Sequence, residues 1–411
     1  MKFNPFGVSG VTAQKAPLAP VTLLTDSRRV AVVIVIIFAG LIPVWLGPGS
    51  SILLVLLCPL ILRRPTRTTL LAAAFSVAYT LPLIFNPAMG YLRLAACLVL
   101  PVAMVQAGAY LGEKVRQPRT IFLIMGALAI WFALPIIILT IKEIILTGDV
   151  VNRTRYLSAT PALPRLWATM CGLMVSLSVA LIGVACIPAA NTGRRSLKIF
   201  LVAFSLLSLL TVVHLLNRTG LVIAAATLVA CLFVPRCTRR KLVRFAIVAV
   251  VLVIAFIALA HLTHTVGEIA DAYIARSHGD YTTLNLGGRL VRWAQGLRLV
   301  ATHPLGTPAG VVINGTPTYA HNLWLDIGVR SGWPAMALMI WLTWLYARHS
   351  RRAILSSATD TLSKGIALCL LLGILLEATV EPVMDASLGY TTLIFLFLGL
   401  LTAYNRRTTP Q

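Results

Sequence analysis

Long apolar runs alternate with short polar connectors over almost the whole chain. These runs occupy residues 30–46, 50–62, 68–86, 91–112, 120–147, 164–188, 197–216, 219–235, 243–264, 322–347, 362–380 and 388–404. A helix needs about 20 apolar residues to cross a bilayer, so the pattern predicts about twelve transmembrane helices. No segment shows sustained strand-like alternation. The predicted fold class is an all-α polytopic membrane protein.

One long polar stretch interrupts this pattern. The sequence predicts a basic tail at 1–29, nine helices within 30–264, a long loop at 265–321, three helices within 322–404 and a short tail at 405–411. Charged and titratable residues gathered in one loop of an apolar protein favour a functional site there.

The basic connectors predict how the chain is oriented. If the N-terminus is cytoplasmic, one side of the membrane collects most of the connector Lys and Arg residues. They are Arg63, Arg64, Arg67, Lys114, Arg116, Arg119, Arg194, Arg195, Lys198, Arg236, Arg239, Arg240, Lys241, Arg244, Arg348, Arg351, Arg352, Lys364, Arg406 and Arg407. Cytoplasmic loops carry such an excess, so both termini are predicted to be cytoplasmic and the 265–321 loop to face outward.

Composition supports a membrane protein and argues against a nucleic-acid-binding one. Of the 411 residues, 58% are apolar and 11% are charged, whereas soluble domains carry about 25% charged residues. The net charge of +23 comes from residues between apolar runs, where anionic lipid headgroups lie. We therefore expect membrane lipids as partners and no nucleic acid. The seven cysteines show neither a disulfide framework nor a metal-binding spacing.

Several ionisable residues fall in different connections on the predicted outer side. Arg218 is the single charge in a tight turn, Asn217-Arg-Thr-Gly220, and Asp385 follows Glu381 in the last outer connection. Arginine is disfavoured on that side, which indicates a function for Arg218. The alternative is that Arg218 only extends to the headgroups.

The loop contains a predicted short amphipathic helix that begins at Arg289. Its apolar face is predicted to consist of Leu290, Trp293, Ala294 and Leu297. Arg289 and Arg292 are three residues apart and therefore neighbours, whereas Arg298 points to the opposite side. Arg289 and Arg292 are candidate substrate contacts. The alternative is a basic helix that lies in the lipid headgroups.

His321 lies where the loop re-enters the membrane, between Tyr319 and Asn322. Neither Cys nor a carboxylate follows at the third or fourth position, so a metal site is disfavoured. The position favours acid–base chemistry or substrate binding over simple packing. His303, in contrast, belongs to a His-Pro-Leu-Gly turn that Pro and Gly suffice to explain.

These motifs occur in a recognisable order. The Asn-Arg-Thr-Gly turn is followed by Gly-Gly-Arg-x-x-x-Trp, His-Pro-x-Gly, Ala-His-Asn-x-x-Leu and Gly-Trp-Pro. Together with the dozen spans, this order resembles the O-antigen ligase and polymerase superfamily, and most of all the bacterial O-antigen ligases. The motifs cover roughly residues 200–340. The resemblance implies a GT-C-like glycosyltransferase architecture with one long periplasmic loop in the bacterial inner membrane.

The resemblance also implies a reaction and the residues that perform it. Such ligases transfer O-antigen from undecaprenyl pyrophosphate to a sugar of lipid A–core on the periplasmic face, and they complete lipopolysaccharide without a cofactor. By this resemblance, Arg218 and Arg289 bind the pyrophosphate, with Arg292 beside them, and His321 is the catalytic base. Two arginines can neutralise a leaving pyrophosphate without a metal, and histidine can accept the proton of the acceptor hydroxyl. Direct attack then gives inversion in one displacement.

Three other residues are possible contributors, and three other activities stay open. The possible residues are Tyr319, Asn322 and Asp385. An O-antigen polymerase or a protein O-oligosaccharyltransferase would use the same donor with a different acceptor. A transporter of lipid-linked glycans is the alternative from another class, although transporters tend to carry ionisable residues at mid-membrane.

Overall fold

The computed structural model of the chain describes residues 23–41, 54, 65–85, 90–115, 117–149, 151, 156–157, 166–186, 195–232, 267, 289–307, 310–313, 316–381, 384 and 388–408. Two predicted spans, 50–62 apart from Leu54 and 243–264, lie outside these residues. Most of the 265–321 loop before Arg289, and Asp385, lie outside them as well.

The first half of the described chain is helical. Its long helices are α1 (Leu23–Gly40), α5 (Arg67–Leu83), α6 (Tyr91–Lys114) and α7 (Pro118–Thr147). Local sequence explains where α7 begins and ends. Pro118 occupies its first turn, where a missing N–H costs nothing, and Gly148 follows its end with φ 74°.

The described residues between 156 and 232 form a short antiparallel strand pair and four helices. The elements are β1 (Tyr156–Leu157), β2 (Leu166–Trp167), α8 (Ala168–Ala180), α9 (Ile182–Cys186), α10 (Arg195–His214) and α11 (Arg218–Leu232). The run predicted at 164–188 is therefore a strand and two helices rather than one helix.

The last part of the chain contains a second hairpin. The elements are α14 (Arg289–Thr302), β3 (Val311–Ile313), β4 (Thr316–Thr318), α15 (Leu323–Leu355), α16 (Thr361–Val380) and α18 (Leu388–Thr408). Both hairpins are antiparallel and two-stranded, and the sequence analysis did not predict them. They are too short for hydrophobic alternation to reveal.

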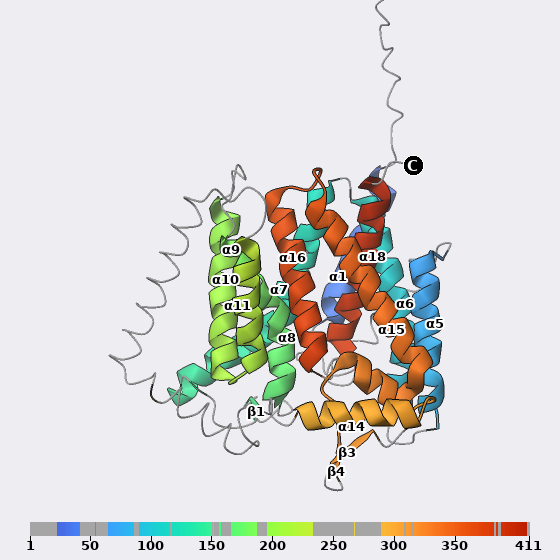
Figure 1. Cartoon of the computed structure of the whole chain (residues 1–411). Coiled ribbons are helices and arrows are strands. Elements are labelled where there is room, and N and C mark those ends of the chain that lie inside the picture. Colours follow the sequence, from blue (N-terminus) through green and yellow to red (C-terminus); the bar gives the residue numbers. More distant parts are fainter. Residues whose placement is uncertain are drawn as a thin grey trace, which may run out of the picture.

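Helix α15 differs from the single span predicted at 322–347. It is broken at Gly332, whose φ of 82° and ψ of −178° are not helical, and it continues to Leu355. Pro334 follows the break and cannot donate a helical hydrogen bond. The first part of α15 therefore takes its own direction, close to α14 (Figure 1).

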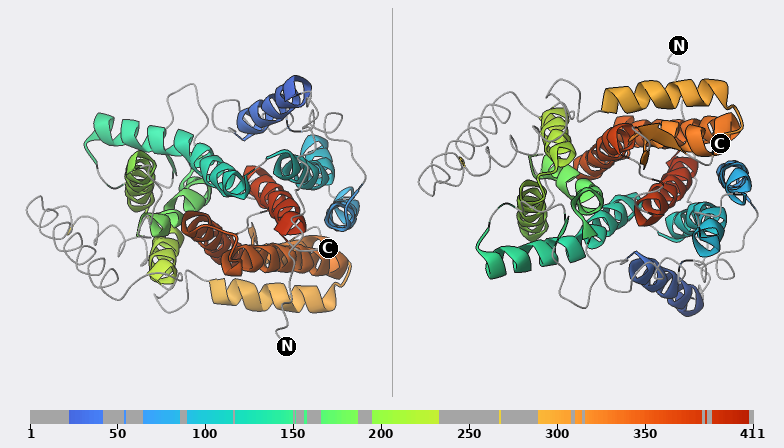
Figure 2. Two further views of the ribbon diagram at one scale, coloured as in Figure 1. Left: turned by 90° about the horizontal axis from the view of Figure 1, so that it is seen from above. Right: turned by 90° about the horizontal axis from the view of Figure 1, so that it is seen from below.

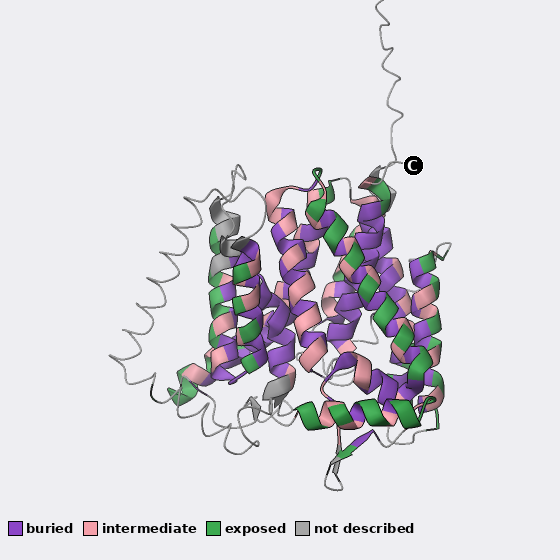
Figure 3. Ribbon diagram, in the orientation of Figure 1, coloured by how far each residue is buried: buried purple, intermediate pink, exposed green. Residues whose placement is uncertain are grey.

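The long helices run side by side, and α14 lies across one end of them (Figure 1). Seen along the bundle, α18 occupies the middle, with α6, α7, α15 and α16 around it (Figure 2). Every residue from Gly389 to Asn405 is buried, as the purple ribbon of α18 shows (Figure 3).

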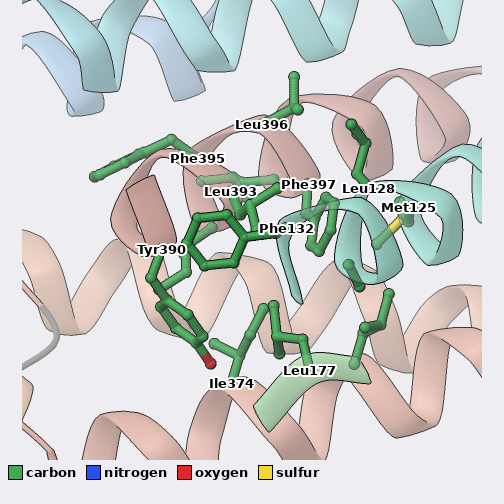
Figure 4. Packing of buried hydrophobic residues seen from close by; sticks show 14 of the residues in the cluster. Met125, Leu128, Phe132, Leu177, Ile374, Tyr390, Leu393, Phe395, Leu396 and Phe397 are labelled. Carbon is green, nitrogen blue, oxygen red and sulfur yellow. The ribbon is translucent and has the colours of Figure 1, made fainter. Parts of the chain in front are cut away.

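Small residues allow α6 and α18 to approach closely. A Cβ on Gly108 would come within 2.2 Å of Leu396 O, and one on Gly399 within 2.2 Å of Val105 O. Larger residues fill the other side of α18, where Phe132, Tyr390, Leu393 and Phe397 pack together (Figure 4). Close backbone contact through small residues is typical of helices that pack inside a membrane.

Within the described residues, four helices are long and apolar enough to cross a membrane: α6, α7, α16 and α18. Shorter apolar segments are found at Val30–Gly40, Met170–Val184, Ile199–His214 and Arg218–Cys231. The mostly helical fold is consistent with an all-α membrane protein. The count of twelve spans and the sides to which the loops belong stay predictions.

Candidate functional site

The candidate site lies at the end of the bundle that α14 crosses (Figure 1). Four segments meet there: the start of α11, the start of α14, the loop before α15, and the residue after α16. Three of these four segments carry residues that the sequence singled out.

Glu381 is the residue that joins these segments. Its Oε1 accepts from Arg289 Nη2 at 2.7 Å and from Thr219 Oγ1 at 3.3 Å. Its Oε2 lies 3.4 Å from His321 Nδ1. The side chain of Glu381 is only 4% exposed, so its charge is paired away from water. A buried carboxylate needs such partners, and Glu381 has both a cationic one and a neutral one.

The backbone around His321 is held in an uncommon conformation. His321 has φ 56°, in the left-handed region that non-glycine residues rarely adopt. Asp326 accepts from the backbone N–H of Ala320 at 2.6 Å and of Asn322 at 3.1 Å. Trp293 Nε1 donates to the His321 carbonyl at 3.3 Å. These contacts on both sides fix the direction in which the imidazole points, as strained backbones at functional sites often require.

Asn322 caps α15. Its side-chain oxygen accepts from the N–H groups of Trp324 at 3.2 Å and Leu325 at 3.1 Å, as an N-cap residue does. Its Nδ2 donates to the Thr379 carbonyl at 3.1 Å, which ties the start of α15 to the end of α16. Asn322 thus has a structural role that brings His321 beside Glu381. A contact between Asn322 and substrate stays a prediction.

Tyr319 lies beside the candidate base. Its ring meets the His321 ring edge-on, with centroids 6.5 Å apart and an interplanar angle of 90°. The guanidinium of Arg330 sits 5.0 Å from the centre of the Tyr319 ring, in a cation–π contact. The sequence analysis did not single out Arg330, because it follows the motif inside an apolar run.

The turn that carries Arg218 reaches the same site. Leu216 has φ 52°, and Asn217 Oδ1 accepts from Gly220 N at 2.8 Å, which caps α11. Thr219, the next residue, donates to Glu381. Arg218 is exposed at the first position of α11. The structure therefore places Arg218 next in sequence to a residue that contacts the site carboxylate.

The buried residues of helix α14 lie outside its predicted apolar face. Gly296 and Val300 are the buried residues, whereas Leu290, Ala294 and Leu297 of the predicted apolar face are exposed. The reason is a small core that sequence periodicity could not show: Val300 packs with Val311, Ala320 and Val329. Gly296 lets the chain before α15 come close, since a Cβ there would lie 3.4 Å from Ala320 Cβ.

The arginines of α14 keep the separation predicted for them. Arg289 and Arg292 are both half-buried, and Arg298 is exposed. Arg289 is the one for which a contact with Glu381 is recorded. Arg289 and Arg292 are therefore neighbours on α14, as their spacing predicted.

The His-Pro-Leu-Gly turn joins α14 to the break in α15. Gly306 has φ 88° and donates to the His303 carbonyl at 2.9 Å, while Trp333 N donates to Pro304 O at 2.8 Å. A Cβ on Gly306 would lie 2.5 Å from Arg330 O, and one on Gly332 would lie 2.4 Å from Pro304 O. His303 itself is exposed, and its predicted structural role stays a prediction.

Among the described residues, no three His, Cys, Asp or Glu side chains gather in a way that could hold a metal ion. Asp385 lies outside the described residues, so its predicted role stays a prediction. The sequence analysis named Glu381 only as the first residue of the connection that contains Asp385. A signal was available: an arginine that is partly buried at the end of an apolar bundle needs a counter-charge.

The described fold is mostly helical and has four candidate membrane spans, which indicates a membrane protein. Its candidate site is a cluster of ionisable residues at one end of the helices. A family model described as O-antigen ligase matches residues 203–340, which contain Arg218, Arg289, Arg292 and His321. This match supports a member of the O-antigen ligase/polymerase superfamily. No protein with a curated description matches the chain. The family implies a glycosyltransferase-like enzyme of lipopolysaccharide biosynthesis, with a lipid-linked glycan and an acceptor as partners.

Proposed function

We propose that the protein is an O-antigen ligase, which transfers O-antigen from undecaprenyl pyrophosphate to a sugar of lipid A–core at the periplasmic face of the inner membrane. The family supports the general reaction, and the motifs of the sequence favour the ligase. The observation that carries the proposal is the contact of one buried carboxylate, Glu381, with both Arg289 and His321.

The arginines would bind the pyrophosphate of the donor. Arg289 gives one of its N–H groups to Glu381, and this fixes the plane of the guanidinium while its other donors stay available. Arg218 and Arg292 add positive charge from the neighbouring turn and from the next turn of α14. Planar guanidinium groups bind phosphate oxygens in pairs of hydrogen bonds. As the leaving pyrophosphate gains charge, these groups stabilise it, so the proposed reaction requires no metal.

His321 would be the general base. Its Nδ1 faces Glu381, so a proton on Nδ1 leaves the other ring nitrogen, Nε2, as the acceptor. Nε2 takes the proton of the acceptor hydroxyl while the hydroxyl oxygen attacks the anomeric carbon. The bond from that carbon to the pyrophosphate oxygen breaks, and the configuration is inverted. Glu381 then stabilises the imidazolium, as the carboxylate of a catalytic triad does.

The end-on location of the site fits two lipid substrates. The long chains of both substrates would lie in the bilayer, and their polar groups would meet at the level of α14. Holding two reactants in the same plane and at a fixed depth contributes to the rate by proximity.

The test is a transfer assay with purified protein, an undecaprenyl-pyrophosphate-linked glycan and several acceptors offered separately. A ligase transfers the glycan to lipid A–core. Extension of a second lipid-linked glycan would indicate a polymerase, and transfer to a peptide would indicate a protein oligosaccharyltransferase. Movement of the donor across liposomes without any transfer would indicate a transporter. Each of the last three results would contradict the proposal.

A further inference from the structure

A cluster of five arginines lies in the last turns of α15 and α18, at the end of the bundle opposite α14 (Figure 1). Helix α15 contributes Arg348, Arg351 and Arg352, and α18 contributes Arg406 and Arg407. All five are exposed. Among the described residues, no carboxylate forms an ion pair with any of them. The positive charge of this arginine cluster is therefore available to an anion from outside the described part of the chain.

Side-chain contacts bring the two groups of arginines together. Asn405 Nδ2, on α18, lies 3.0 Å from His349 Nδ1 on α15 and donates to the His349 carbonyl at 3.2 Å. His349 directly follows Arg348 in the sequence, and Asn405 directly precedes Arg406. Because the two helices are joined at His349 and Asn405, the arginines beside this junction form one basic surface.

An apolar stripe on α15 leads to the arginine cluster. Ile340, Trp341 and Trp344 are 47%, 51% and 51% exposed. At spacings of three and four residues, Trp341, Trp344 and Arg348 share one face of the helix. The Arg348 guanidinium sits 5.0 Å from the centre of the Trp344 ring, in a cation–π contact. Tryptophan is enriched where lipid headgroups meet acyl chains, so the stripe and the cluster together match a molecule with an apolar tail and an anionic head.

We propose that this surface is a binding site for an anionic phospholipid. Arg348, Arg352 and Arg406 bind the phosphate of the headgroup, and an acyl chain lies along Ile340 and Trp341. Planar guanidinium groups suit phosphate oxygens, because they donate paired hydrogen bonds. Each basic residue near an anionic bilayer surface adds to the attraction. The site lies at the other end of the bundle from Glu381 and His321, so it does not depend on the transfer reaction proposed above.

The first test is native mass spectrometry of the purified full chain, with phosphatidylglycerol and phosphatidylcholine offered at equal concentration. We expect the wild type to retain phosphatidylglycerol preferentially. Arg348→Gln combined with Arg352→Gln should lower the affinity for phosphatidylglycerol about 25-fold, which is about 5-fold for each arginine, and leave phosphatidylcholine binding unchanged. Arg67→Gln is the matched control, since Arg67 is an exposed arginine at the start of α5 and lies outside the cluster.

Equal affinity of the wild type for the two lipids would overturn the proposal. A loss in Arg67→Gln as large as in the double glutamine variant would overturn it too, because the attraction would then belong to every exposed arginine alike. Lysine at positions 348 and 352 keeps the charge and should keep most of the preference for phosphatidylglycerol. An equal loss in the lysine and glutamine variants would show a disturbed fold rather than a lost charge, and it would also contradict the site.

The second test is tryptophan fluorescence of the full chain in lipid nanodiscs that contain phospholipids brominated on the acyl chain. Bromine quenches a nearby indole, so brominated phosphatidylglycerol should quench more strongly than brominated phosphatidylcholine. Trp344→Phe leaves the arginines intact and should remove this excess quenching, and an excess that persists in Trp344→Phe would place the lipid elsewhere.

Inorganic phosphate separates a lipid headgroup from a free anion as the ligand. Added at the concentration of the lipid, it should leave the excess quenching unchanged, because it lacks the acyl chain that packs on α15. Displacement of the brominated lipid by inorganic phosphate would mean that the arginine cluster binds a free anion, and it would overturn the proposal.

Discussion

Arg289 Nη2 donates to Glu381 Oε1 at 2.7 Å and joins two residues that are 92 positions apart in the chain. One residue begins α14 and the other follows α16, so the contact closes the site across two segments that sequence alone does not connect. The Arg289 side chain is 23% exposed, whereas the Glu381 side chain is almost fully buried. The exposed part of Arg289 is the part that a phosphate can reach.

We predict that Arg289→Lys lowers kcat/KM strongly although the charge is kept. Lysine lacks the planar fork that can hold Glu381 and a phosphate oxygen at the same time. Loss of one such charge-assisted contact in a transition state costs about 10²–10³-fold. The measurement is steady-state transfer with the lipid-linked donor. Arg298→Lys is the matched control, because Arg298 is exposed on the same helix and should behave as the wild type. Equal sensitivity at both positions would contradict the placement of Arg289.

We predict that Glu381→Gln lowers turnover by roughly 10²–10⁴-fold, as expected when the carboxylate that orients a catalytic histidine is lost. The amide keeps the shape of the side chain but can neither balance Arg289 nor stabilise a charged His321. Asp149→Asn is the control, since Asp149 is an exposed carboxylate in the connection after α7. Single-turnover kinetics would separate the chemical step from donor binding. Wild-type turnover in Glu381→Gln would remove Glu381 from the mechanism.

Gly332→Ala should destabilise the junction between α14 and α15. Gly332 has φ 82°, and a Cβ there would lie 2.4 Å from Pro304 O, which is backbone and cannot move aside easily. Strained conformations of this kind cost about 1–3 kcal/mol each. Thermal unfolding in detergent would report the loss. Gly126→Ala in α7 is the control, because a Cβ there would meet only Ile366 at 3.8 Å. Similar unfolding temperatures for the two variants would show that the junction tolerates a side chain.

The proposed orientation predicts that the end of the bundle crossed by α14 faces the periplasm. A single cysteine at Leu305, which is exposed in the turn after α14, should react with a membrane-impermeant thiol reagent added from the periplasmic side. The native cysteines would be replaced first. A cysteine at Ser356, between α15 and α16, should react only after the membrane is opened. The reverse pattern would place the whole site in the cytoplasm.

Sequence periodicity predicted the long helices well, but it did not show which residues of α14 are buried. The runs at 91–112, 120–147, 362–380 and 388–404 correspond closely to α6, α7, α16 and α18. A helix that crosses a membrane is apolar over about 20 residues, so its sequence alone reveals it without knowledge of its neighbours. For α14, Leu290, Ala294 and Leu297 of the predicted apolar face are exposed, and a small core around Val300 decides which side is buried.

The candidate site was predicted from its motifs but not from its contacts. Motif order pointed to Arg218, Arg289 and His321, and the structure brings the segments of all three to Glu381. Glu381 itself has no motif around it. Its role depends on the packing of the end of α16 beside the start of α15. The hydrogen bond from Asn322 to Thr379 holds these two ends together, and one sequence cannot show it. Asp385 was named because it lies in the last outer connection, and its role stays a prediction.

The last prediction concerns His321. We predict that His321→Ala reduces turnover by roughly 10²–10⁴-fold, the usual contribution of a positioned base, while the lipid-linked donor still binds. The geometry supports this separation: His321 Nδ1 lies 3.4 Å from Glu381, whereas the proposed pyrophosphate contacts come from α11 and α14. Donor affinity and turnover should be measured on the same preparation, with Arg289→Ala beside it as the variant that weakens donor binding. His303→Ala is the control for the loss of an imidazole, since His303 is exposed in a turn. Turnover that recovers fully at saturating donor would assign His321 to binding, and unchanged turnover and affinity would remove it from the site.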